Sequence, residues 1–228
     1  MLKIFILDYF SYIIKIRGVE EMKVLFINGS PHEDGVCNRG ILEMQEIFKE
    51  ENIETETLFL GNEPIHQCSG CGFCYKNKRC VRDDLVNQVG EKLDQYDAIV
   101  ACSAVHYASA TGYITTFLDR LFYCYGKKMR GKVYANFVSA RRGGTTAALD
   151  QLNKYGLIAG MIMVGGQYWN MIHGNNKEEV LEDKEGLQNL RTLARNITYI
   201  LKLIENGKDN NIIYPEREKF TGTNFVRK

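Results

Sequence analysis

Short apolar segments alternate with amphipathic segments along this chain. Four apolar segments have the length of strands that are buried on both faces, and Glu54–Leu60 alternates polar and apolar residues as a half-exposed edge strand does. The four segments are 24–27, 97–103, 131–139 and 160–164. Between them, apolar residues recur every three or four positions, most regularly in 187–204. Strands that alternate with helices predict an α/β fold, a doubly wound five-stranded parallel sheet with helices on both faces.

Polar residues mark where two of the helices begin. Asn38 is a good N-cap type and precedes a helix with Ile41, Met44 and Phe48 along one face. The pair Asp83-Asp84 is predicted to cap a second helix that runs toward Leu93. A third helix has apolar residues on one side, with Asp119 and Arg120 between them.

The loops that follow the four buried strands are rich in glycine, hydroxyl and aromatic residues. They span 30–38, 103–110, 139–146 and 165–174. In doubly wound sheets, ligands bind beyond the carboxyl ends of the strands, where these loops lie. The first loop, after Gly29-Ser30-Pro31, brings backbone N–H groups, a hydroxyl and a helix N-terminus together, as a phosphate requires. It has neither G-x-G-x-x-G nor a closing Gly-Lys-Ser/Thr, so a monophosphate fits it better.

Composition narrows the function classes. The chain has 228 residues, of which 45% are hydrophobic and 25% charged, so a single globular domain is expected. Its formal net charge is +1, and basic residues are interspersed with acidic ones. We therefore expect no nucleic acid and no membrane as partners.

Four of the seven cysteines, Cys68, Cys71, Cys74 and Cys80, crowd into one short loop. This usage is typical of a cytoplasmic protein with a metal site rather than of a disulfide framework. Three thiols at x2 spacing and a fourth soon after favour a cubane iron-sulfur cluster, whereas structural zinc prefers two separated pairs. Zinc and free thiols stay open as alternatives. Gly70 and Gly72 are expected to let the backbone turn sharply between the ligands.

The ends of the chain are expected to stand apart from this domain. Residues 1–21 are interpreted as an N-terminal extension or a misassigned start, because Met22 directly precedes the first core strand. Residues 22–207 form the predicted domain. The tail 208–228 carries aromatic residues on a polar background, which favours a subunit interface for 214–220 together with Tyr168-Trp169.

Several of these segments, in this order, resemble the flavodoxin-like flavoproteins of the NAD(P)H-dependent FMN reductase superfamily, and within it the iron-sulfur flavoproteins. The resemblance runs from about Met22 to the final helix. It rests on Asn28-Gly29-Ser30-Pro31, the four-cysteine loop followed by Asp83-Asp84, the 103–107 loop, Phe117-Leu118-Asp119-Arg120 and Ser139-Ala140-Arg141-Arg142-Gly143-Gly144. Two departures are Ser103-Ala104-Val105-His106-Tyr107, where the family usually has Ser-Pro-Val-Tyr, and a first loop with fewer hydroxyls.

The resemblance implies strand order 2-1-3-4-5, FMN at the carboxyl edge and a homodimer or dimer of dimers. Carried over by position, the FMN phosphate is surrounded by Ser30, His32, Cys37 and Asn38, so Glu33 and Asp34 must point away. The isoalloxazine ring is lined by Ala104, Val105, His106 and Tyr107 on one side, and by Ser139, Arg141, Arg142, Gly143 and Gly144 on the other. The four loop cysteines are the implied 4Fe-4S ligands, close to the flavin. Tyr168 and Trp169 stack on flavin or substrate, or pack in the core.

Two function classes follow from this resemblance. The first is an FMN-dependent oxidoreductase that transfers electrons from NAD(P)H to a small-molecule acceptor such as a quinone, azo or nitro compound. The second is an iron-sulfur flavoprotein electron carrier that a ferredoxin-like protein feeds. A thiol- or metal-based redox sensor is a third, weaker alternative. The sequence names no catalytic residue, no physiological acceptor and no preference between NADH and NADPH.

Overall fold

The structure is a computed structural model that describes residues 22–61, 63–219 and 221–223. The predicted extension 1–21 lies outside these residues. The sheet is built on β1 (Lys23–Asn28), β2 (Glu54–Phe59), β3 (Ala98–His106), β5 (Val133–Ala140) and β6 (Ile162–Met163). Their order, β2-β1-β3-β5-β6, is the predicted 2-1-3-4-5 once the short strand β4 is left out, and all four pairings are parallel.

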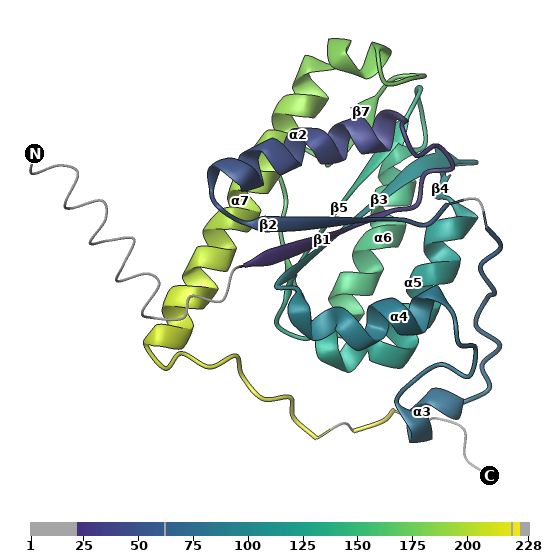
Figure 1. The fold of residues 1–228 in the computed structure, drawn as a ribbon, viewed down its shortest axis with the longest axis vertical. Helices are drawn as coiled ribbons and strands as arrows, with labels where there is room; N and C mark the ends of the chain where they lie inside the picture. Colours follow the sequence, from purple (N-terminus) through teal and green to yellow (C-terminus); the bar gives the residue numbers. More distant parts are fainter. Residues whose placement is uncertain (1–21, 62, 220, 224–228) are drawn as a thin grey trace, which may run out of the picture.

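Helices cover both faces of the sheet (Figure 1). One face carries α2 (Val36–Glu50) and α7 (Lys184–Asp209). The other carries α4 (Leu85–Lys92), α5 (Gly112–Met129) and α6 (Thr145–Ala159). The remaining short elements are α3 (Phe73–Asn77), η1 (Leu93–Gln95) and η2 (Glu179–Glu182), and two short strands, β4 (Ser109–Ala110) and β7 (Met171–His173).

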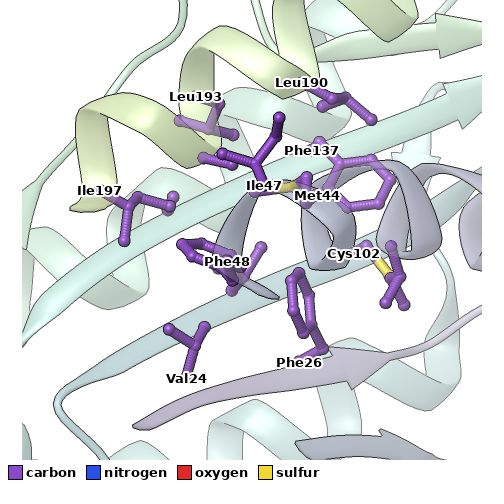
Figure 2. Close-up of a cluster of buried hydrophobic side chains, with 14 of the residues drawn as sticks. Val24, Phe26, Met44, Ile47, Phe48, Cys102, Phe137, Leu190, Leu193 and Ile197 are labelled. Carbon is purple, nitrogen blue, oxygen red and sulfur yellow. The ribbon is translucent and has the colours of Figure 1, made fainter. Parts of the chain in front are cut away.

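The central strands are apolar on both faces because each face meets its own layer of helices. In β1, Val24 and Phe26 point into the core beneath α2 and α7, whereas Leu25 and Ile27 point into the core beneath α4 and α5. Figure 2 shows the first core, where side chains from β1, β3 and β5 meet those of α2 and α7. Each fully buried aliphatic or aromatic side chain contributes about 1.5–3 kcal/mol to the stability of the fold, relative to the same side chain in water. The two cores therefore fix the strands whose carboxyl ends form this edge of the sheet.

Two predicted boundaries are wrong. Helix α2 begins at Val36 with Gly35 as its N-cap, two residues before the predicted Asn38, and Cys37 is already buried in its first turn. The predicted fifth strand, 160–164, is reduced to the two residues of β6. Gly160 there has a φ of 69° and ends α6, which delays the strand. The chain then leaves the sheet and returns as β7, which pairs with the far end of β5.

Candidate functional site

The turn after β1 is fixed by its own polar groups. Asn28 is buried, and its Oδ1 accepts a hydrogen bond from the Ser30 N–H at 3.0 Å. The Ser30 Oγ in turn accepts from the His32 N–H at 3.2 Å, while the carbonyl of Gly29 accepts from the Thr111 hydroxyl at 2.6 Å. Ser30 is only 4% exposed. The side chain of Ser30 is therefore held in a preformed turn.

The N-terminus of α2 faces this turn with its first N–H groups free of any side-chain cap. Gly35 precedes the helix and offers no capping side chain, and the first turn carries no acidic residue. A helix start of this kind favours an anion, because its unpaired N–H groups and the helix dipole both point outward. The predicted phosphate loop thus has suitable local geometry.

Beneath the loop, two buried cysteines join three strands and a helix. The Cys37 Sγ lies 3.2 Å from the Ser139 Oγ, and the Cys102 thiol donates to Asn28 Oδ1 at 3.6 Å. Hydrogen bonds from Cys102, and also from the hydroxyls of Ser139 and Ser30, lower the pKa of Cys37 in spite of its burial. Burial raises the pKa of Cys102 well above its usual range. Cys102 is therefore a neutral thiol donor, and Cys37 links the first loop to the third.

The remaining predicted phosphate residues lie nearer the surface. His32 is exposed and Asn38 half-buried. The two carboxylates, Glu33 and Asp34, are exposed, and Asp34 forms an ion pair with Lys177. This pairing offsets the Asp34 charge, which would otherwise oppose an anion at the helix start.

The predicted loop 103–110 is a β-hairpin. Strand β3 continues through Ala104, Val105 and His106, and β4 pairs back onto it, with Val105 opposite Ala110. Tyr107 and Ala108 form the turn, with φ values of 50° and 59°. The Tyr107 side chain is fully exposed at the tip. The hairpin extends the central strand past the sheet and forms one wall of the candidate site.

The third loop, after β5, packs against this hairpin. Gly144 has a φ of 95° and precedes α6, and a Cβ at this position would lie 2.8 Å from the Ala108 Cα. Only glycine allows this approach of two backbones. Ser139 is buried, whereas Arg141, Arg142 and Gly143 are exposed. Neither arginine forms an ion pair with any residue in the described part of the chain.

The fourth loop, between β6 and β7, is clamped from behind by one asparagine. Asn189 of α7 is buried, and its Oδ1 accepts from the N–H groups of Gln167 and Tyr168 at 2.7 and 2.9 Å. Its Nδ2 donates to the carbonyl of Trp169 at 3.0 Å. Tyr168 and Trp169 are each 56% exposed, with ring centroids 4.7 Å apart. Core packing, one of the two expectations for these rings, is excluded.

The four cysteines of the predicted metal site line one small cavity, together with residues of α5. Cys68 and Cys71 are exposed, while Cys74 and Cys80 are half-buried. Gly70 and Gly72 have φ values of 64° and 70°, which confirms the predicted sharp turns. Among the described residues, no three His, Cys, Asp or Glu side chains stand in an arrangement that would hold a metal ion. The donor set fits an iron-sulfur cluster chemically, because all four thiols face one space, but they have to converge to bind one.

This cysteine loop lies along the middle of α5 rather than among the loops of the carboxyl edge. Its walls include Tyr123 and Cys124, and the hydroxyls of Tyr75 and Tyr123 are hydrogen-bonded to each other. Tyr123 follows Gly112, the first residue of α5, by eleven residues, which places it roughly 16 Å along the helix from the end nearest the hairpin. Figure 1 draws α3 on the outer side of α4 and α5. The expectation that this loop lies at the carboxyl edge of the sheet is therefore corrected.

Two residues of α5 at this cavity were missed by sequence reasoning. Cys124 appears isolated in the sequence, yet it lines the cavity and lies beside Cys74. Burial, and then Cys74 and Cys80, raise the pKa of Cys124 to about 12. Arg120, interpreted as a polar residue between apolar ones, is 2% exposed and contacts the loop directly. Two features of the sequence pointed to it without giving it a role: it lies within an otherwise buried helical stripe, and it ends the motif Phe117-Leu118-Asp119-Arg120.

The chain has a flavodoxin-like α/β fold. This class is defined by the order of the strands, by helices on both faces of the sheet and by the loops at its carboxyl edge. Solved structures of this class superpose on the chain. A flavone reductase matches with a TM-score of 0.63 at 19% identity, covering 81% of this chain and 64% of that one. A flavoenzyme NAD(P)H:(acceptor) oxidoreductase from Paracoccus denitrificans matches with a TM-score of 0.57 at 16% identity, covering 78% and 98%. These likenesses concern the fold alone.

The chain belongs to the NADPH-dependent FMN reductase family, whose model matches residues 22–176, and within it to the iron-sulfur flavoproteins. The iron-sulfur flavoprotein of Methanosarcina thermophila is 30% identical over 193 residues, which cover 82% of this chain and all of that protein. A second iron-sulfur flavoprotein, from Methanocaldococcus jannaschii, is 28% identical over 192 residues, 81% of this chain and all of that one. The family expected from the sequence is confirmed.

Proposed function

We propose that this protein is an FMN-dependent oxidoreductase that takes electrons from NAD(P)H and passes them to a small-molecule acceptor. The observation that carries the proposal is the meeting of three loops around an uncapped helix start. Ser30, the hairpin 103–110 and the loop 139–144 are tied together through the Cys37–Ser139 and Gly29–Thr111 contacts. Membership of the FMN reductase family supports the same cofactor.

The phosphate of FMN fits the first loop by charge and by geometry. The Ser30 hydroxyl and the first N–H groups of α2 are the proposed donors to the phosphate. The nearby carboxylate of Asp34 is ion-paired with Lys177. His32, Cys37 and Asn38 complete the proposed surround. One phosphate satisfies these donors, and no glycine-rich fingerprint for a pyrophosphate is present, so FMN is favoured over FAD.

The isoalloxazine ring would lie between the two other loops. Ala104, Val105 and His106 offer backbone groups along the extended end of β3. Arg141 and Arg142, which have no carboxylate partner among the described residues, are free to face the ring edge that becomes negative on reduction. A cation there stabilises the reduced form and raises the flavin potential. Bound FMN would supply the hydride acceptor and the one-electron donor.

The four loop cysteines are the proposed ligands of a 4Fe-4S cluster. Their common cavity and their short spacing support this assignment, as do the iron-sulfur flavoprotein relatives. The exposed thiols Cys68 and Cys71 are free to move toward Cys74 and Cys80 without disturbing either core. A bound metal would also hold this segment together, since it has few buried apolar side chains of its own.

The second candidate is an electron carrier that accepts single electrons at the cluster from a ferredoxin-like protein. The exposed position of the loop favours it, because one-electron partners need a surface cluster. Basic residues beside the loop, Lys76, Lys78, Arg79 and Arg82, suit an acidic donor. In this case NAD(P)H would not reduce the protein by itself.

One experiment separates the two candidates. Anaerobically purified protein is characterised by its absorption spectrum, by its released flavin, and by iron and sulfide content. NADPH, NADH and a reduced ferredoxin are then added separately while flavin absorbance is followed. Rapid bleaching by a pyridine nucleotide supports the oxidoreductase, whereas bleaching by ferredoxin alone supports the carrier. Protein that carries only FAD contradicts the assignment of the flavin.

A homodimer or dimer of dimers is proposed as the assembly. Tyr168 and Trp169 form an exposed aromatic pair on a clamped loop, which suits a partner surface. The tail is proposed to take part as well. Within one chain, the Tyr214 hydroxyl donates to the Gly160 carbonyl at 3.1 Å, and the Arg130 Cζ lies 5.0 Å from the centroid of the Tyr214 ring. Phe220 lies outside the described residues. A monomer in sedimentation at micromolar concentration would contradict the assembly.

The proposed cellular site is the cytoplasm. It is motivated by the reduced, metal-type cysteine usage. Within the described part of the chain, the helices lack the combination of length and hydropathy that crossing a membrane requires.

A further inference from the structure

Arg120 occupies a position where an unpaired charge would be strongly unfavourable. It lies on α5 between Phe117, Leu118 and Leu121, and only 2% of it is exposed. Burial of a guanidinium is strongly unfavourable unless the group is paired and hydrogen-bonded. The groups that pair with Arg120 therefore indicate the role of its guanidinium.

All of these partners belong to the cysteine loop and its flanks. Arg120 forms a bidentate ion pair with Asp84, with Nη1–Oδ2 and Nη2–Oδ1 distances of 2.7 and 2.9 Å. Its Nη1 also donates to the His66 carbonyl at 3.2 Å, and its Nη2 to the Arg82 carbonyl at 3.3 Å. His66 precedes the first loop cysteine and Asp84 follows the last. A single side chain thus closes both ends of the loop.

The same guanidinium donates to a proposed cluster ligand. The Arg120 Nη2 lies 3.2 Å from the Cys80 Sγ. Asn87 holds the backbone of that cysteine, accepting from the Cys80 N–H at 2.9 Å and donating to the Cys80 carbonyl at 3.0 Å. The hydroxyl of Tyr125 in turn donates to Asn87 at 2.9 Å. Cys80 is thus held both at its backbone and at its sulfur.

The guanidinium is also incompletely satisfied as it stands. Arg120 Nε is buried and has no hydrogen-bond partner, and Arg120 lines the cavity that the four cysteines share. A cation with a spare donor at a cavity of thiols is suited to a group that gains negative charge. A reduced cluster with four thiolate ligands is such a group.

We infer that Arg120 is a positioning residue of the cluster site: it fixes Cys80 as the anchored ligand and, through its N–H to that sulfur, raises the reduction potential. The inference rests on the cluster part of the proposed function. Asp84 offsets part of the guanidinium charge, so the two residues act on the potential with opposite sign.

The test uses Arg120→Lys and Asp84→Asn in the full chain, with Arg79→Lys as the matched control. Lysine keeps the charge but loses the bidentate fork, and asparagine keeps the N-cap of α4 while losing the charge. Arg79 adjoins Cys80 in sequence but points to Asp83 and Glu91. Iron and sulfide per chain, flavin per chain and the cluster midpoint potential are measured after anaerobic reconstitution.

Arg120→Lys is expected to shift the midpoint potential of the cluster to more negative values, and Asp84→Asn to more positive ones. Arg79→Lys is expected to leave it unchanged. Flavin per chain should stay at the wild-type level in all three variants. Simple loosening of the loop would move both variants in the same direction. If Arg120→Lys fails to fold, Arg120→Gln takes its place, since it also loses the N–H groups of the fork, and it is expected to shift the potential to more negative values, opposite to Asp84→Asn. Wild-type potentials in both variants, with iron bound, overturn this inference alone. A wild type without iron overturns the cluster proposal and the inference together.

Discussion

The carboxyl edge of the sheet, where FMN is proposed to bind, and the cysteine loop are built in different ways. The carboxyl edge extends three central strands, and its turns are fixed by buried side chains such as Asn28, Ser30 and Ser139. The cysteine loop has no fully buried residue between Cys68 and Cys80, and it is held mainly by Arg120 and Asn87. The first site is preorganised by the fold, whereas the second relies on a few polar anchors and on whatever its thiols bind.

The sharpest test of this difference is a charge placed in the preorganised site. Ser30→Glu is expected to abolish FMN retention, because a carboxylate would face the phosphate in a buried turn that cannot relax. Flavin per purified chain is the measurement. Ser30→Ala, which removes one hydrogen bond worth about 1 kcal/mol, is the control and should weaken binding only about fivefold. Stoichiometric flavin in Ser30→Glu would refute the phosphate site.

The reverse test removes an anchored thiol. Cys80→Ala is expected to bring iron per chain close to zero after anaerobic reconstitution while flavin stays at wild-type levels, because the two sites share no side chain. Cys124→Ser is the matched control, since this thiol lines the cavity but is outside the four proposed ligands. Parallel loss of flavin and iron would mean that the two regions are not independent.

A smaller effect is expected at the clamp of the fourth loop. Asn189→Ala leaves the N–H groups of Gln167 and Tyr168 without their acceptor, which should cost about 1 kcal/mol in the free energy of unfolding. Urea unfolding measures it, and Trp169, the only tryptophan in the chain, reports on the loop by fluorescence. Gln188→Ala on the exposed side of α7 should be neutral. Equal stability of both variants would contradict the clamp.

Removal of residues 1–21 should have the smallest effect. The first strand begins at Lys23 and takes its pairing from β2 and β3, so the fold and the flavin content are expected to be unchanged in the truncated chain. Yield of soluble protein and flavin per chain are the measurements. Insolubility or flavin loss would show that the extension is structural.

Periodicity predicted most of the fold, because buried strands and amphipathic helices leave regular apolar patterns. The cap at Asp84 is confirmed as well, with its side chain accepting from the Val86 N–H. The hairpin at Tyr107-Ala108 was not predictable: two-residue turns with positive φ usually carry glycine or asparagine, and neither is present here. The turn packs closely on Gly144, 36 residues further along the chain, a contact that the local sequence does not reveal.

Site residues that act through a local sequence pattern could be predicted. Those that act through contacts with residues far away in the sequence could not. Spacing identified the four cysteines, and the strand-loop-helix pattern identified Ser30. Arg120 and Asn189 were missed because a buried polar residue looks like a solvated one until its partners are known. Those partners are 36 to 54 residues away for Arg120 and 20 to 22 for Asn189.

The two edges of the sheet discourage association with other chains in different ways. On one side, Glu54 and Glu56 line β2 and share Lys23, so an incoming strand would meet a row of charged side chains. On the other side, β6 offers only two residues before the chain leaves the plane of the sheet. An uninterrupted fifth strand would add backbone hydrogen bonds, but it would also present a longer template for aggregation. The split strand therefore favours solubility at some expense of sheet strength.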